Sequence, residues 1–193
     1  MKILILGGYG TFGGRLAQLL ANDERLTLLI AGRSKDKADA FCKQLPAGAQ
    51  KTPLFFDRNS DVEAQIRIIN PDVVVDATGP FQSYGEDPYR VVKASIANGV
   101  DYMDLADGSE FVKNIRQFDE QSKLKSTYVL SGVSSFPVLT AAVVRRLSSG
   151  ISHIHTIKGG IIYEPEALRS ARSENLRRFF ADRSRWPAPL MRG

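Results

Sequence analysis

The sequence predicts an α/β protein built around a doubly wound parallel sheet with helices on both faces. Short apolar runs rich in Val, Ile and Leu alternate with helix-sized amphipathic segments about six times, a pattern typical of parallel sheets with helical crossovers. A glycine-rich turn directly follows the first apolar run. Since such crossovers are right-handed, the expected strand order is 3-2-1-4-5-6.

Six short segments are expected to form the strands. The first is an apolar run, as expected for a strand buried on both faces, and the fourth, Val73-Val74-Val75, is β-branched throughout. The third is weaker than the others. The six expected strands are residues 2–6, 26–31, 54–56, 73–75, 100–105 and 128–132.

Helical patterns fill the segments between these strands. Phe12, Leu16, Leu19 and Leu20 recur at helical spacing, which predicts one apolar stripe along the first helix. The pair Asn98-Gly99 is a typical C-terminal signal for the fourth. The expected helices are residues 11–22, 35–45, 61–69, 88–97, 109–123 and 137–150.

The chain changes character after residue 150. We expect residues 1–150 to form one domain and residues 151–193 to be a short C-terminal extension or the start of a truncated second domain. A strand over 151–163 and a helix over 164–180 are expected there. Fewer than about 45 residues cannot easily build an independent core.

The glycine-rich turn indicates a dinucleotide site of the Rossmann type. Gly8, Gly10 and Gly13 fit the pattern G-x-G-x-x-G, with Tyr9, Thr11 and Phe12 between them. The glycines permit a tight turn, backbone contact with a pyrophosphate and close packing of the helix, whose first N–H groups face the phosphates. The alternative interpretation is a structural turn without a ligand.

The end of the second expected strand favours NADP over NAD. An NAD enzyme carries Asp or Glu there for the ribose 2′-hydroxyl, but this chain has Ala31-Gly32-Arg33-Ser34-Lys35. A guanidinium binds a phosphate in a bidentate way, so Arg33 and Ser34 are expected to hold the 2′-phosphate. NAD stays an alternative cofactor. The alternative for Arg33 and Lys35 is that they only begin a solvated helix.

Two more strand ends supply candidate cofactor residues. Asp57 ends the third strand, where it could contact the adenine or only cap a turn. Thr78, Gly79, Pro80 and Phe81 follow the fourth strand, where backbone is expected close to the ribose and nicotinamide. A simple turn is the alternative for this segment.

Composition excludes several other classes of protein. The apolar runs are too short to span a bilayer and no signal peptide is recognisable, so a cytoplasmic protein without membrane contact is expected. One cysteine, Cys42, and two histidines offer no metal cluster and no internal disulfide. Residues 167–193 contain seven Arg against two acids, which accounts for the net charge of +5. A solvated helix face explains these arginines better than an acidic partner or nucleic acid.

Together these segments resemble the saccharopine dehydrogenase-like reductases over about residues 1–160. The resemblance implies an NAD(P)-dependent oxidoreductase that transfers a hydride at a C–N bond, or a C–O or C–C bond, of a small metabolite. It also implies a second domain for substrate binding and dimerisation, and so a homodimer. It rests on the glycine loop, Ala31–Ser34, Pro71–Phe81, Tyr84-Gly85, Tyr102–Leu105 and Ser131–Pro137.

Two other functions fit part of the sequence. Tyr89 and Lys93 match the Tyr-x-x-x-Lys pair of short-chain dehydrogenases, although they follow the fourth strand and that family places the pair after the fifth. A non-catalytic NADP(H)-binding module or sensor is the other alternative. No catalytic residue can be selected, since several side chains near strand ends could face the nicotinamide, namely Tyr84, Asp104, Asp107 and Ser134.

Overall fold

A computed structural model describes residues 1–81 and 84–157 of the chain. Contacts divide the chain into a unit of residues 1–150 and a second unit of residues 151–193. Only residues 151–157 of the second unit are described, and they contain no strand. The rest of the expected strand over 151–163 and the expected helix over 164–180 lie outside the described residues.

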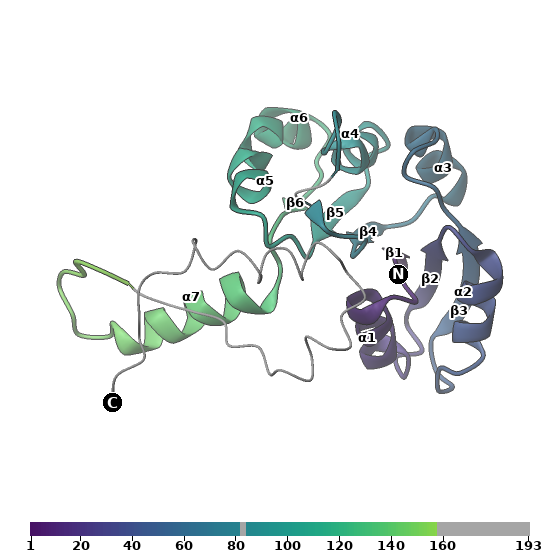
Figure 1. The fold of residues 1–193 in the computed structure, drawn as a ribbon, viewed down its shortest axis with the longest axis horizontal. Helices are drawn as coiled ribbons and strands as arrows, with labels where there is room; N and C mark the ends of the chain where they lie inside the picture. The colour runs from purple at the N-terminus through teal and green to yellow at the C-terminus, as the bar shows by residue number, and fades with distance from the viewer. Residues whose placement is uncertain (82–83, 158–193) are drawn as a thin grey trace, which may run out of the picture. The chain divides into compact units, whose positions relative to one another are not determined.

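The first unit is built on one parallel sheet, shown in Figure 1. Its strand order is β3-β2-β1-β4-β5-β6, which confirms the expected doubly wound topology. Every neighbouring pair is parallel. The strands are β1 (Lys2–Leu6), β2 (Thr27–Gly32), β3 (Gln50–Phe55), β4 (Val73–Asp76), β5 (Asp101–Asp104) and β6 (Val129–Leu130).

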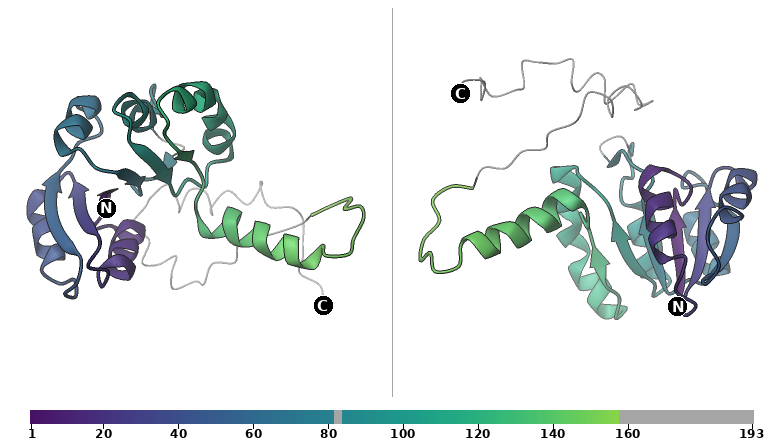
Figure 2. Two further views of the ribbon diagram at one scale, coloured as in Figure 1. Left: turned by 180° about the vertical axis from the view of Figure 1, so that it is seen from behind. Right: turned by 90° about the horizontal axis from the view of Figure 1, so that it is seen from below.

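Helices cover both faces of this sheet (Figures 1 and 2). On one face Ala17 of α1 and Ala38 of α2 pack with Ile5. On the other face Ile66 of α3 and Val91 of α4 join a second apolar cluster. The helices are α1 (Thr11–Leu20), α2 (Lys35–Cys42), α3 (Val62–Ile69), α4 (Arg90–Ala97), α5 (Ser109–Asn114), α6 (Asp119–Leu124) and α7 (Ser135–Leu147), with a 3₁₀ turn η2 (Ile115–Phe118).

The apolar strands contribute side chains to both clusters because successive strand residues point to opposite faces of a sheet. In β1, Leu4 belongs to the cluster under α3 and α4, whereas Ile5 belongs to the cluster under α1 and α2, and both are fully buried. Each such side chain contributes about 1.5–3 kcal/mol on burial. The continuous apolar runs therefore fix the two-layer arrangement of helices around the sheet.

The expected apolar stripe on α1 is wrong in part. Phe12 is 70% exposed and Leu19 is 65% exposed, while the buried face of the helix is made by Gly13, Gly14 and Ala17. Residues without long side chains let α1 lie close to β1. The helix is thus rotated toward its glycines and away from the face that hydrophobicity alone indicates.

Several other element boundaries differ from expectation. β3 begins at Gln50 because it is an edge strand whose residues are mostly half-buried, so an apolar run marks only its end. The expected helix over 109–123 is divided into α5, η2 and α6, yet Phe111 and Phe118 are both buried. β6 has two residues and α7 begins at Ser135. No helix among the described residues is long and apolar enough to cross a membrane.

Candidate functional site

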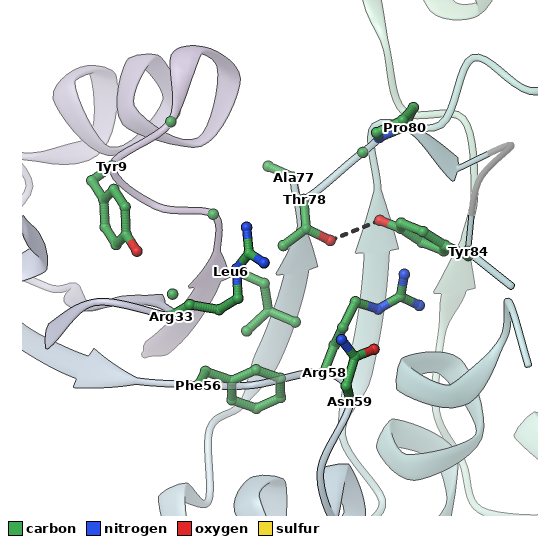
Figure 3. Close-up of a pocket in the computed structure, with 14 residues that line it drawn as sticks. Leu6, Tyr9, Arg33, Phe56, Arg58, Asn59, Ala77, Thr78, Pro80 and Tyr84 are labelled. Atoms are coloured by element: carbon green, nitrogen blue, oxygen red, sulfur yellow. Dashed lines mark hydrogen bonds between the residues drawn. The ribbon is translucent and has the colours of Figure 1, made fainter. Parts of the chain in front are cut away.

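A cavity of about 440 Å³ opens at the carboxyl ends of β1 to β4 (Figure 3). This is the edge of a doubly wound sheet where ligands bind, beside the point at which the strand order reverses between β1 and β4. The cavity is lined by Leu6, Gly7, Tyr9, Gly10, Gly32, Arg33, Phe56, Arg58, Asn59, Ala77, Thr78, Gly79, Pro80 and Tyr84.

The glycine loop forms a tight turn at one side of the cavity. Gly7 has a φ of +70°, which favours glycine. The Gly10 N–H donates to the Gly7 carbonyl over 2.8 Å, and the Gly8 N–H donates to the Ala31 carbonyl over 3.1 Å. A Cβ on Gly13 would lie only 2.4 Å from the Gly7 oxygen. The loop therefore brings the start of α1 against the end of β1.

The start of α1 presents donors beside this loop. Gly10 is the N-cap of the helix, and the first bond along the helix runs from the Gly14 N–H to the Gly10 carbonyl over 2.8 Å. The N–H groups of Thr11 and Phe12 thus have no acceptor within the helix. The first turn carries no acidic residue. This end of α1 is therefore suited to an anion.

Arg33 brings a cation into the cavity from the end of β2. Figure 3 shows its side chain pointing toward the backbone at Ala77 and Thr78. The next residue, Ser34, is the N-cap of α2, and its hydroxyl accepts from the Lys37 N–H over 3.3 Å. The Ser34 N–H donates to the Tyr9 hydroxyl over 3.0 Å. The two loops that flank this part of the cavity are thus tied together.

A chain of hydrogen bonds runs from the opposite wall of the cavity into the core. The Tyr84 and Thr78 hydroxyl oxygens are 2.7 Å apart. The Thr78 hydroxyl donates to Asp76 Oδ1 over 2.5 Å, so its second hydrogen bond is received from Tyr84. Burial, followed by the charge of Asp76, raises the pKa of Tyr84 well above its ordinary value. Tyr84 is therefore a neutral phenol whose hydrogen points to Thr78.

Arg58 lies over the ring of Tyr84. Its guanidinium carbon is 3.2 Å from the ring centroid, close enough for a cation–π interaction, and its Nη2 donates to the Pro88 carbonyl over 3.4 Å. Its Nε is buried and has no hydrogen-bond partner among the described residues. Arg58 thus places a second cation, with unused hydrogen-bonding capacity, in the wall of the cavity.

Two buried carboxyl groups end neighbouring strands just below the site. Asp76 and Asp104 are opposite each other in the register of β4 and β5, and both are fully buried. Burial raises the pKa of both carboxyl groups. Hydrogen bonds lower the pKa by a smaller amount, and they come from Thr78 to Asp76 and from Gly132 and Ala106 to Asp104. Asp104 Oδ1 also accepts from the Ser131 hydroxyl over 3.0 Å. Asp104 therefore joins the end of β5 to the segment after β6.

We expect the Asp104→Asn variant to gain stability relative to the wild type as the pH rises. A raised pKa means that the folded protein binds the proton more tightly than the unfolded chain. The contribution of Asp104 to the unfolding free energy is therefore full below the ordinary carboxyl pKa and is lost as the pH rises through the raised value. Each unit of pKa difference corresponds to about 1.4 kcal/mol. Asparagine keeps the accepting oxygen and does not titrate.

Urea unfolding of both proteins between about pH 4 and pH 8 measures this effect. Asp23 titrates in the opposite sense, since hydrogen bonds from Arg25 lower its pKa to about 2, but it is common to both proteins and cancels in the comparison. A stability difference that stays constant across this pH range would contradict the expectation.

The structure brings only part of the predicted site into the cavity. Tyr9, Gly10, Arg33, Thr78, Gly79 and Pro80 line it, whereas Gly8, Thr11, Phe12, Gly13, Ser34, Asp57 and Phe81 do not. Asp57 Oδ1 accepts from the Asn59 N–H over 3.0 Å. This hydrogen bond is the one expected of a residue that caps the turn after β3. Phe81 is buried against Tyr84 and Phe111, with ring centroids 4.8 Å and 5.1 Å away.

The Tyr89 and Lys93 pair does not form a proton-transfer site here. The Tyr89 hydroxyl donates to the Phe111 carbonyl over 3.0 Å, and its ring stacks on Phe111. Lys93 pairs with Asp87 over 2.8 Å. Neither residue lines the cavity. Of the four residues left open as partners of the nicotinamide, only Tyr84 lines it.

Sequence reasoning missed Arg58 and Asn59. Both follow β3, at the same sheet edge as the glycine loop, and their position after a strand was the available signal.

No group of three or more His, Cys, Asp or Glu in the described part of the chain could hold a metal ion.

Comparison with known proteins finds a family match over most of the chain. The family model described as the saccharopine dehydrogenase NADP binding domain matches residues 3–134 of the 193, a range that includes every residue lining the cavity. The chain is also 28% identical over 149 residues to a Caenorhabditis elegans protein named "Lipid droplet localized protein". That match covers 70% of this chain and 34% of the C. elegans protein.

Solved structures share the fold. The apo saccharopine dehydrogenase (L-Glu forming) of Saccharomyces cerevisiae matches with a TM-score of 0.58 and 19% identity, over 78% of this chain and 31% of that chain. The biliverdin reductase of Synechocystis, in complex with biliverdin and NADP⁺, matches with a TM-score of 0.50 and 17% identity, over 79% and 44% of the two chains. This chain thus spans about a third of the length of the worm and yeast proteins.

Proposed function

Because this chain belongs to the saccharopine dehydrogenase NADP binding domain family, we propose that residues 1–150 hold NADP(H) for an oxidoreductase that acts on a small metabolite. The cofactor is NADP(H), with NAD(H) as the second candidate. One observation carries the proposal: the glycine loop and the Arg33 cation line the same cavity at the ligand-binding edge of the sheet.

The glycine loop fits a pyrophosphate. Apart from its neighbours in the chain, a Cβ on Gly10 would have one heavy atom of the described residues within 4 Å, the Gly7 oxygen at 3.1 Å, so open space adjoins this peptide. The N–H groups at the start of α1 would donate to the phosphates there. We propose that Gly8 and Gly13 serve this site indirectly by shaping the turn, while Thr11 and Phe12 contribute backbone N–H groups.

The cavity fits the adenosine half of the cofactor. A dinucleotide lies across the switch point with one half on each side of it, and the lining residues come from the ends of β1 to β4 and from Tyr84, with none from β5 or β6. Arg33 and Ser34 would hold the 2′-phosphate. Arg58, Asn59 and Tyr84 would surround the adenine and its ribose, with Thr78, Gly79 and Pro80 beneath them.

We propose hydride transfer at a C–N bond as the reaction, with C–O and C–C bonds as alternatives. When bound, NADP(H) supplies or accepts the hydride. Tyr84 directs its hydrogen to Thr78, and Asp104 accepts hydrogen bonds from Ser131 and Gly132. Both arrangements favour a role in positioning the neighbouring loops over donation of a proton to the substrate. The reacting half of the cofactor would lie beyond β4, over the ends of β5 and β6.

A non-catalytic NADP(H)-binding module is the second candidate. The cavity would bind the adenosine half of the cofactor, and neither the Tyr84 phenol nor the Asp104 carboxyl next to this site is arranged as a proton donor to a substrate. Calorimetry with NADPH, followed by an absorbance assay of NADPH oxidation with imino acids and keto acids, separates the two functions. Binding with oxidation supports the enzyme, binding alone supports the module, and no binding contradicts both.

We expect Arg33→Gln to weaken NADPH binding about 30-fold while NADH binding changes less than about twofold. A hydrogen bond to a charged group is worth about 2 kcal/mol, and only NADPH carries the 2′-phosphate. Calorimetric titration of each cofactor measures the effect. Arg15, which is exposed on α1 outside the cavity, provides the matched control Arg15→Gln. An equal loss for both cofactors would refute the assigned role of Arg33.

Cellular location and assembly stay predictions. We propose a cytoplasmic protein without nucleic acid partners, and a homodimer as the assembly. The C. elegans relative is named for lipid droplets, so droplet association is the alternative location. Flotation of cell lysates on a density gradient distinguishes them, because droplet-bound protein rises with the neutral lipid.

A further inference from the structure

Tyr9 connects the glycine loop to the turn after β2. Its hydroxyl oxygen accepts from the Ser34 N–H over 3.0 Å, so its own hydrogen is available for another acceptor. The structure places no acceptor for that hydrogen among residues 1–81 and 84–157. Tyr9 and Arg33 both line the cavity, and Figure 3 shows them on the same side of it.

Gly32 makes room for this arrangement. A Cβ on Gly32 would lie 2.5 Å from the Tyr9 hydroxyl oxygen and 2.7 Å from ring atoms Cε1 and Cζ. Any larger residue at position 32 must therefore push the Tyr9 ring away from Ser34. The glycine at the end of β2 and the tyrosine in the glycine loop thus form a matched pair that holds the hydroxyl in place.

We propose that the Tyr9 hydroxyl is a specificity-determining donor to the 2′-phosphate of NADP(H), an inference that rests on the proposed function. The end of β2 is where the ribose 2′ group of a dinucleotide lies. An acid there accepts from a 2′-hydroxyl, whereas Tyr9 and Arg33 both offer hydrogens. Donors without an acid select an anion at that position.

Calorimetric titration of NADPH and NADH into wild type and Tyr9→Phe tests this role. Phenylalanine keeps the ring against Gly32 and removes only the O–H. We expect NADPH affinity to fall about tenfold, as for one charge-assisted hydrogen bond, and NADH affinity to change less than about twofold. Gly32→Ala, which displaces the hydroxyl by a different route, should shift the ratio of the two affinities in the same direction.

Tyr128→Phe is the matched control, because it removes a phenol hydroxyl from an exposed tyrosine that does not line the cavity. It should leave the ratio of NADPH to NADH affinity unchanged. If the wild type prefers NADPH and both Tyr9→Phe and Gly32→Ala retain that full preference, the role of Tyr9 is overturned while the proposed function stands. If the wild type itself shows no preference for NADPH, the cofactor assignment fails, and the inference with it.

Discussion

Replacing Gly13 with alanine is expected to lower the unfolding free energy by about 3 kcal/mol, the upper end of the usual cost of overpacking. The added Cβ would lie 2.4 Å from the Gly7 oxygen and 2.9 Å from the Gly7 carbon. Both atoms belong to the backbone of a loop held by the Gly10 to Gly7 hydrogen bond. No side-chain rotation can relieve the contact, so α1 must move away from the end of β1.

Gly14→Ala is the matched control on the same helix. Its Cβ would meet the tip of the Phe41 ring at 3.3 Å, and a ring can shift where backbone cannot. Alanine also favours the helix by about 1 kcal/mol over glycine, so the net effect should be within about 1 kcal/mol of zero. Urea unfolding of the two variants measures the difference. Equal midpoints would show that the close approach of Gly13 to Gly7 contributes little.

The strand order could be predicted because three adjacent strands of the sheet, β1, β2 and β4, are largely buried. β1, β2 and β4 are flanked by other strands and covered by helices, so apolar side chains occupy both faces and leave a continuous run in the sequence. β3 lies at the edge and tolerates Gln50, Lys51 and Thr52, so its first half left no such run. Periodicity failed on α1 for another reason, since glycines carry no hydrophobic signal although they make the closest contact.

The site was predictable where a motif describes local geometry. The glycine loop and the turn at Arg33 each lie within a few residues, and their places after the first and second expected strands make these short patterns indicate a dinucleotide. Arg58 over Tyr84 joins residues 26 positions apart on two loops, and no local pattern connects them. The same holds for Asp76 and Asp104, which become neighbours only through the register of β4 and β5.

Gly10→Ala is expected to weaken NADPH binding about 100-fold, equivalent to about 2.7 kcal/mol, while the fold is kept. Gly10 has a φ of −82° and a ψ of −177°, which any residue can adopt. Among the described residues beyond its chain neighbours, its new Cβ would meet only the Gly7 oxygen, at 3.1 Å, so the loop must shift by a few tenths of an ångström. The methyl group would instead occupy the space in which a pyrophosphate approaches the peptide.

Adenosine 2′-monophosphate separates this effect from a general loss of binding, because it carries the 2′-phosphate and no pyrophosphate. Its affinity, measured by fluorescence or NMR titration, should change less than about twofold in Gly10→Ala, since the contacts proposed for Arg33 and Tyr9 with the 2′-phosphate are kept. Thermal unfolding should place the variant much closer to the wild type than Gly13→Ala. A variant that binds NADPH as tightly as the wild type would show that the diphosphate does not lie against Gly10. Two variants at the same helix start therefore separate packing from ligand contact. Gly13→Ala should lower the stability of the fold, whereas Gly10→Ala should lower the affinity for NADPH and keep the fold.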